Sequence, residues 1–260
     1  MKRNLLYIFL LLASVLKGQD IHFSQFYLAP TFLNPASTGA MENTHRVSML
    51  YKDQWRSVTT PYKTSSFSYD AKIGGKDRRN KDFIGLGIAA FTDKAGDSQM
   101  GISQVVAGFS YHKKLGREHR FSFGMQGGLR QYSISFNNAQ WGTQFNGADF
   151  DPSMGSMEYF NNQTNTVSQA NAGVQYQFKK EDYNIIIGLA THHLTRQENS
   201  FSGTFFIREQ VKTVAQASLE PPPFQSNIHF VPHLLFIRQG QSFEAIAGSL
   251  VKFKTKEASR

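Results

Sequence analysis

The chain has 260 residues, of which 40% are hydrophobic, 18% charged and 13% aromatic, and this composition excludes an intrinsically disordered protein. The absence of cysteine excludes a disulfide scaffold, a thiolate zinc site, a thiol nucleophile and a lipidated cysteine anchor. The formal charge of +9 falls to +6 (25 Lys and Arg against 19 Asp and Glu) without Lys2, Arg3 and Lys17 of a predicted leader, so we expect no nucleic-acid partner.

The first 18 residues have the pattern of a secretory signal peptide. Met1, Lys2 and Arg3 form a positively charged start, and residues 5–16 form an apolar stretch that ends at Lys17 and Gly18. A membrane anchor would need about 20 apolar residues, and this stretch is shorter. We therefore expect cleavage after Gly18, with residues 19–260 as the mature protein.

Beyond residue 19 the dominant pattern is the two-residue alternation of β-strands. Phe121, Phe123, Met125 and Leu129 alternate with small or polar residues that include Arg130, which gives one apolar face and one polar face. In chain order we expect roughly ten strands, near residues 46–53, 62–73, 84–89, 104–111, 121–136, 172–179, 183–189, 201–211, 227–238 and 243–248. Tight turns at 81–82, 116–119, 181–182 and 239–240 predict an antiparallel meander.

Strand length and the composition of the two faces favour a transmembrane β-barrel. Several predicted strands are about ten residues long, which suits a membrane-crossing strand better than an average globular one. Aromatic residues lie near the predicted strand ends: Tyr111, Tyr132, Phe136, Tyr176, Phe178, Tyr183 and Phe253. We therefore expect an all-β, antiparallel outer-membrane β-barrel. A soluble β-sandwich produces similar alternation and stays as the alternative.

The connections between strands differ in length and in charge. Residues 137–168 form a long, Asn-rich stretch that we interpret as a loop on one rim and as a candidate for partner contact, although a loop without a partner fits equally well. Residues 220–223 form a second, proline-rich break. Basic residues gather at 76–81 and 252–256, where they suit lipid phosphates, an acidic partner or simply solvated turns.

Candidate chemical sites are weak. His192 and His193 are neighbours, so on a strand they would point to opposite faces, and His229 and His233 would share a face about 13 Å apart, too far for one metal ion. Asp93 and Asp97 flank a predicted turn without the carboxylates of a calcium site. A serine-nucleophile elbow and a phosphate-binding loop are both missing from the sequence, and Gly85 and Gly87 lie inside a strand pattern as thin lumen-facing positions. We expect a non-enzymatic protein without cofactor or metal.

Several long motifs occur in a fixed order along the mature chain. Residues 19–30 read QDIHFSQFYLAP and residues 33–39 read LNPASTG. Further motifs lie at residues 46–56, 93–97, 127–131, 141–144 and 192–201. With these motifs the chain resembles the PorP/SprF family of Bacteroidetes over nearly the whole mature sequence.

The resemblance implies an outer-membrane β-barrel associated with the type IX secretion system, which assists the secretion or surface anchoring of cargo such as gliding adhesins. The implied partners are outer-membrane lipid, the C-terminal domain of a secreted adhesin or other cargo, and a periplasmic peptidoglycan-binding lipoprotein. Within the N-terminal signature, residues 19–40, we single out a candidate docking or plug segment, with a structural, barrel-capping role as the alternative. Its residues are His22, Phe23, Ser24, Gln25, Phe26, Tyr27, Asn34 and Pro35.

Two departures from the family pattern concern the end of the sequence. Family members usually continue through further strands after the segment that resembles residues 243–253, and many outer-membrane barrels end on an aromatic residue, whereas this sequence ends on Arg260. The resemblance leaves open whether the barrel is incomplete at its C-terminal end. Two other functions also stay open: a general diffusion porin, which the polar face of the strands allows, and a periplasmic β-sandwich binding module.

Overall fold

The computed structural model describes residues 25–57, 60–74, 82–96, 99–135, 141–151, 153–155, 163–181, 183–201, 206–222 and 228–253. The predicted leader and the candidate residues His22, Phe23 and Ser24 lie outside the described residues. Within the described residues, no helix is long and apolar enough to cross a membrane.

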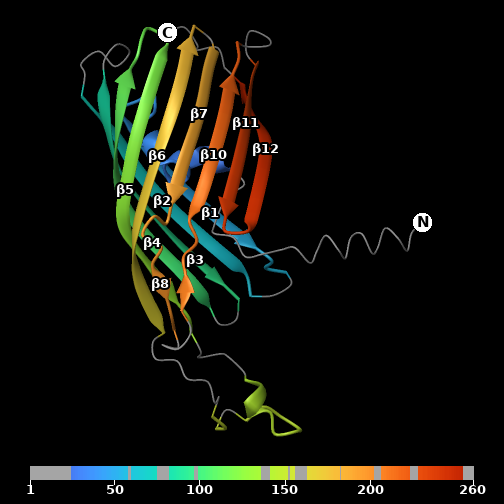
Figure 1. Ribbon diagram of the computed structural model, residues 1–260. Helices are drawn as coiled ribbons and strands as arrows, with labels where there is room; N and C mark the ends of the chain where they lie inside the picture. Colours follow the sequence, from blue (N-terminus) through green and yellow to red (C-terminus); the bar gives the residue numbers. More distant parts are fainter. Residues whose placement is uncertain are drawn as a thin grey trace.

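Ten long strands form one antiparallel sheet that curls into a half-barrel (Figure 1). The strands are β1 (His45–Gln54), β2 (Tyr62–Ile73), β3 (Phe83–Ala95), β4 (Met100–Lys114), β5 (His119–Ser133), β6 (Thr164–Lys180), β7 (Tyr183–His192), β10 (Lys212–Glu220), β11 (Ile228–Gln239) and β12 (Ser242–Phe253). Each strand pairs with the next in this order, and β1 and β12 are the two edges. The short strands β8 (Glu198–Asn199) and β9 (Ile207–Arg208) pair only with each other.

The side chains of the sheet are sorted in the opposite sense to those of a water-soluble protein. Large apolar residues on the convex face are exposed, for example Val105 (60%) and Leu129 (59%). Polar residues on the concave face are buried, for example Asp70 (0%) and Arg130 (4%). An exposed apolar belt of this extent is stable only against lipid, and the strands are long enough to cross a bilayer. The fold is that of an outer-membrane β-barrel wall, as predicted, and the β-sandwich alternative is wrong.

Most of the predicted strands are confirmed, and one is wrong. Among the described residues of 201–211, only β9 is a strand and it does not join the wall, which continues instead with β10 (Lys212–Glu220), a strand that the sequence pattern did not indicate. The outward positions of β10 carry Thr213, Ala215, Ala217 and Leu219, so the strand has only one of the large apolar residues that marked the others. Among the predicted aromatic residues near strand ends, Tyr132 faces inward, where it donates a hydrogen bond to Glu209.

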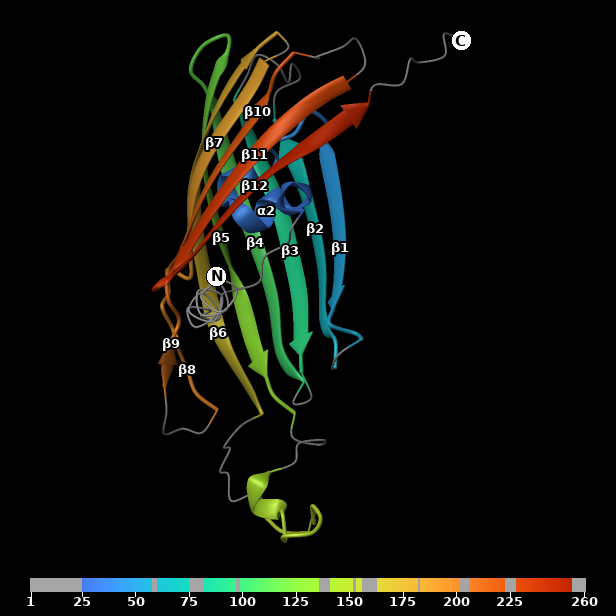
Figure 2. The same ribbon diagram turned by 90° about the vertical axis from the view of Figure 1, so that its right-hand side faces the viewer.

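The two ends of the sheet differ in their connections (Figure 2). The described parts of two long connections lie at one end, which we call the long-loop end: residues 134–135, 141–151, 153–155 and 163 between β5 and β6, and residues 193–201 and 206–211 between β7 and β10. The opposite end, the short-turn end, holds residues 115–118 between β4 and β5 and residue 181 after β6. The predicted long loop on one rim is therefore confirmed, although β6 begins at Thr164, earlier than expected.

Candidate functional site

The N-terminal segment, residues 25–44, lies on the concave face of the sheet (Figures 1 and 2). It contains three short helical turns: η1 (Phe26–Leu28), α2 (Pro30–Leu33) and η2 (Pro35–Ser37). Two of them begin on a proline, whose fixed φ suits the first position of a helix. The Asn34 side chain caps η2 by accepting a hydrogen bond from Ala36 N (2.9 Å).

Five of the candidate residues from the sequence lie in this segment. Asn34 and Pro35 are buried against the sheet and Phe26 is buried in an apolar cluster, whereas Tyr27 is half-buried and Gln25 is exposed. The role of these residues in docking a partner stays a prediction.

Glycines of the wall make room for the centre of the segment. A Cβ atom on Gly124 would overlap the backbone of Pro35, and one on Gly173 would overlap the Asn34 side chain. Asn34 in turn donates a hydrogen bond from Nδ2 to the main-chain oxygen of Val174 (3.0 Å). Small residues at these points let the two backbones approach, which is the usual role of glycine where a second chain segment packs on a strand.

A buried polar cluster holds the end of the segment at Thr38. The Thr38 main-chain oxygen accepts hydrogen bonds from Ser110 Oγ (2.5 Å) and from Nε2 of His112 (2.8 Å). Nδ1 of His112 then accepts from Ser122 Oγ (2.6 Å), so both ring nitrogens of the neutral imidazole are satisfied. Gly85 lies directly beneath Thr38, which confirms its predicted place as a thin lumen-facing position.

Asp70 joins the segment to the first strand. Its carboxylate accepts hydrogen bonds from Gly39 N (2.6 Å) and from Nη2 of Arg46 (2.7 Å), while the same Arg46 nitrogen donates to the Ser37 main-chain oxygen (3.0 Å). Gly39 has a φ of +70°, a conformation that disfavours other residues, and its Cα faces Gly85. A fully buried carboxylate is stable here because a cation and a main-chain N–H both satisfy it.

The other side of the segment packs on an apolar patch of the wall. Phe26 and Leu33 contact a buried cluster of strands β7, β10 and β11, whose members are Ala190, Val214, Leu235 and Ile237. Tyr27 stacks on His233 with the ring centroids 5.2 Å apart. The polar seat, defined as Gly85, Asp70, Ser110, His112, Gly124 and Gly173, thus adjoins the apolar seat, defined as Ala190, Val214, Leu235 and Ile237, and the two meet where Gly173 of β6 pairs with Ala190 of β7.

A second buried polar cluster closes the concave face toward the long-loop end. Glu209, which follows β9, accepts hydrogen bonds from Tyr132 Oη (2.5 Å) and Gln169 Nε2 (2.8 Å) and lies 3.5 Å from Nη1 of Arg130. Both charged side chains are almost fully buried. The connection between β7 and β10 is therefore fixed to the inside of the wall.

The predicted orientation of the paired histidines is wrong. His193 lies one residue beyond β7 with a φ of +59°, so its ring is buried on the same side as that of His192. His192 Nε2 contacts the Leu33 main-chain oxygen (3.0 Å), and His193 Nδ1 contacts Gln169 Oε1 (2.6 Å). His229 and His233 share the inward face of β11, as predicted.

The predicted turn at residues 93–97 is also corrected. Asp93 lies inside β3, where it accepts a hydrogen bond from Thr64 Oγ1 (2.5 Å), and Asp97 lies outside the described residues. In the part of the chain that the structure describes, no three His, Asp or Glu side chains lie close enough together to hold a metal ion.

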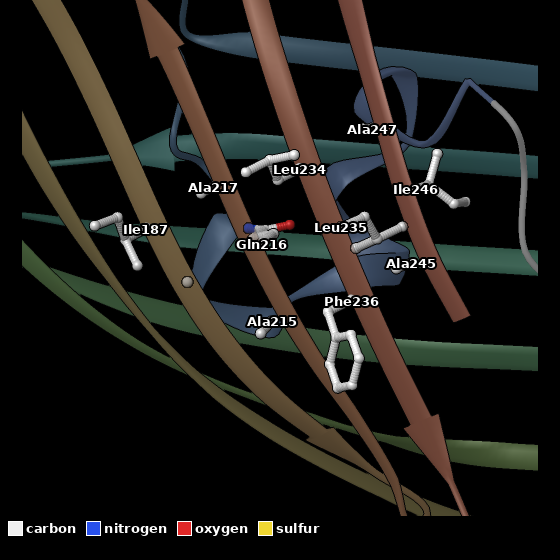
Figure 3. A pocket seen from close by; sticks show the side chains of 11 residues that line it. Ile187, Ala215, Gln216, Ala217, Leu234, Leu235, Phe236, Ala245, Ile246 and Ala247 are labelled. Carbon is white, nitrogen blue, oxygen red and sulfur yellow. The ribbon is translucent and has the colours of Figure 1, made fainter. Parts of the chain in front are cut away.

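The convex face carries an apolar groove of about 400 Å³ across β7, β10, β11 and β12 (Figure 3). Small outward residues of β10 and β12, such as Ala217 and Ala247, alternate across the sheet with the larger Ile187 and Leu234. The groove belongs to the belt that faces lipid.

Comparison with protein families supports the architecture. The model of the family described as "Type IX secretion system membrane protein PorP/SprF" matches residues 15–256. No curated protein and no solved structure matched the chain. Since the family model covers nearly the whole sequence, the chain belongs to the PorP/SprF family of type IX secretion system membrane proteins.

Proposed function

We propose that the protein is a non-enzymatic outer-membrane component that assists the secretion or surface anchoring of cargo such as gliding adhesins. The observation that carries the proposal is the family match over residues 15–256 on a lipid-facing sheet. We further propose that residues 1–18 are removed as a signal peptide and that the concave face holds no catalytic centre. Ser122 and His112 form a hydrogen-bonded pair, but both side chains are buried and the second ring nitrogen of His112 contacts the Thr38 main-chain oxygen.

The N-terminal segment argues against a general diffusion porin. It lies on the polar face that would line a channel, and it is held there by buried hydrogen bonds and an apolar cluster. A porin needs this path open to water. In a liposome-swelling assay we expect little flux of small sugars through the intact protein and a clear increase when residues 25–39 are deleted. Equal flux through both would favour the porin.

The loop between β5 and β6 supports contact with cargo. Its tip folds on itself: Phe145 and Phe150 pair as an isolated bridge, and Asp151 N donates to the Gln144 main-chain oxygen (2.8 Å). The rings of Phe145 and Phe150 lie 5.3 Å apart and are about half exposed. An ordered, exposed aromatic pair at the end of a loop is typical of a protein contact.

Site-specific cross-linking tests this contact. A photo-reactive residue at Phe145 or Phe150 should cross-link to the C-terminal domain of a secreted cargo in intact cells. Leu115, which is 62% exposed in the turn between β4 and β5, provides the control at the short-turn end. Equal cross-linking at Leu115, or cross-linking to no cargo at the loop positions, would contradict the proposal.

A further inference from the structure

A cavity of about 670 Å³ opens on the concave face at the short-turn end. Its walls come from strands β2 to β7 and the turn between β4 and β5, and one side is formed by Ala40 and Met41 of the N-terminal segment. All the wall strands contribute inward-facing positions, so lipid on the convex face has no access to the cavity. Its size lies within the usual range of ligand pockets.

Basic side chains dominate the cavity. We call it the basic vestibule and define it by Lys72, Phe83, Lys114, Arg117, Arg120 and Lys179. Only two carboxylates, those of Glu42 and Glu118, line it among the described residues. Several cations in a concave, partly water-excluded site raise the local concentration of anions.

The cations are held in place by an aromatic ring. Lys72 Nζ lies 4.6 Å and the Arg120 guanidinium carbon 4.9 Å from the centroid of Phe83, whose ring stacks on His112 at 4.1 Å. Nε of Arg120 is buried without a hydrogen-bond partner among the described residues. Two cations beside one ring, one of them with an unsatisfied donor, form a prepared site for an anionic group.

Glu42, near the end of the N-terminal segment, shows how a carboxylate is held beside the vestibule. Its Oε1 lies 2.6 Å from Nζ of Lys179, and the glutamate side chain is 85% exposed. The pKa of Glu42 is lowered, first by the hydrogen bond and charge of Lys179 and further by the charges of Lys252 and Lys72. The region therefore favours negative charge beyond the single ion pair.

We propose that the basic vestibule binds an acidic peptide segment that enters from the aqueous compartment at the short-turn end. The cations come from β2, β4, β5, β6 and the turn before β5, and only Lys72 and Arg120 share the Phe83 ring. This distribution suits several carboxylates along a peptide better than a single compact phosphate. Phe83, Gln177 and Asn184 add the mixed apolar and amide surface that a peptide contacts.

Fluorescence anisotropy with the full-length protein in detergent tests the inference. A labelled octaglutamate peptide should bind, an octaglutamine peptide should not, and binding should weaken as salt rises from 50 to 200 mM. The double substitution Arg117→Gln with Arg120→Gln should weaken binding about five- to thirty-fold, as expected for two partly exposed ion pairs.

The matched control removes two positive charges at the opposite end of β2 and β3. Lys63 and Lys94 pair across these strands and are exposed, so Lys63→Gln with Lys94→Gln should leave binding unchanged. Arg117→Gln alone, in an exposed turn, covers the case in which the Arg120 variant fails to fold, as judged by circular dichroism. Equal binding by the vestibule and control variants, or binding of phosphatidylglycerol vesicles but not of octaglutamate, would overturn the inference.

Discussion

The polar seat and the apolar seat hold the same segment by different physical means. On the polar seat, Thr38, Gly39 and Asn34 each meet a defined hydrogen-bonding partner, and wall glycines fix how closely the backbones approach. On the apolar seat, Phe26 and Leu33 pack on a cluster of aliphatic side chains. Hydrogen bonds in a buried site depend strictly on geometry, whereas apolar burial depends mainly on area.

The difference indicates that the two seats have separate tasks. The polar seat determines where along the wall the segment lies, because a shift of one residue would leave buried donors and acceptors unsatisfied. The apolar seat adds affinity but tolerates small displacements, since aliphatic contacts can re-form after a shift. Changes to the polar seat should therefore alter position, and changes to the apolar seat should alter only stability.

The largest effect is expected from Asp70→Ala. The change leaves the partly buried Arg46 and the Gly39 N–H without their carboxylate, at a cost of about 3–5 kcal/mol. Limited proteolysis within residues 25–44 should accelerate strongly. The control is Asp53→Ala, which breaks the exposed pair with Arg56 and should leave proteolysis unchanged. Protection of the Asp70 variant at the wild-type level would refute the role of the polar seat.

A smaller effect, about 2–3 kcal/mol, is expected from Gly124→Ala. The added Cβ would overlap the backbone of Pro35, which cannot rotate away, so the segment must move. Amide hydrogen exchange at Ala36 and Gly39 should become faster. In Gly127→Ala the nearest heavy atom, Gln169 O, lies 3.8 Å from the new methyl group, so exchange should stay as in the wild type. Similar exchange in both variants would show that close approach does not define the position.

Leu33→Ala tests the apolar seat and should cost about 2 kcal/mol, because the small cluster around Leu33 can partly collapse. The urea concentration at which half of the segment is released should fall. The ratio of the amide hydrogen-exchange rates of Ala36 and Gly39 should stay as in the wild type. A changed pattern would mean that the apolar seat also determines position.

The smallest effect is expected at Asp82, an exposed carboxylate that, like Asp70, accepts hydrogen bonds from a basic side chain and a main-chain N–H. The pKa of Asp82 is lowered to about 2 by the hydrogen bond from Lys113, with further hydrogen bonds from the Lys114 N–H and Tyr111. Because the folded pKa lies below the ordinary value of 3.8, the stabilisation is complete above that value and is lost as the pH falls through about 2. An NMR titration of the carboxyl group should therefore have its midpoint near 2. A midpoint near 3.8 would show that these hydrogen bonds do not hold the Asp82 carboxylate in solution.

Alternation in the sequence predicted the wall wherever the outward residues were large. The strand at 62–73 coincides with β2, and the hairpin of β6 and β7 has the expected turn. β10 was missed because its outward residues are mostly small, whereas residues 201–211 carry several aromatic and aliphatic side chains in a connection. The two-residue periodicity of a strand depends on the difference in polarity between its two faces. Where both faces carry small or polar residues, the sequence pattern does not identify the strand.

The wall residues that hold the N-terminal segment could mostly not be predicted from the sequence. The motif around Asn34 and Pro35 marked the segment, and the glycines at 85 and 87 indicated thin positions facing the lumen. The complementarity of Gly124 to Pro35 and of Asp70 to Gly39 joins residues far apart in the chain. An inward polar residue in a barrel strand otherwise reads as a lumen-facing position in contact with water.

The hydrogen bonds of the N-terminal segment also determine the order of folding. Asn34 and Val174 are 140 positions apart, and Leu33 and His192 are 159 positions apart. Contacts of such separation form late, because the distant strands must first come together. We therefore expect the N-terminal segment, although it is synthesised early, to dock only after strands β6 and β7 have come together.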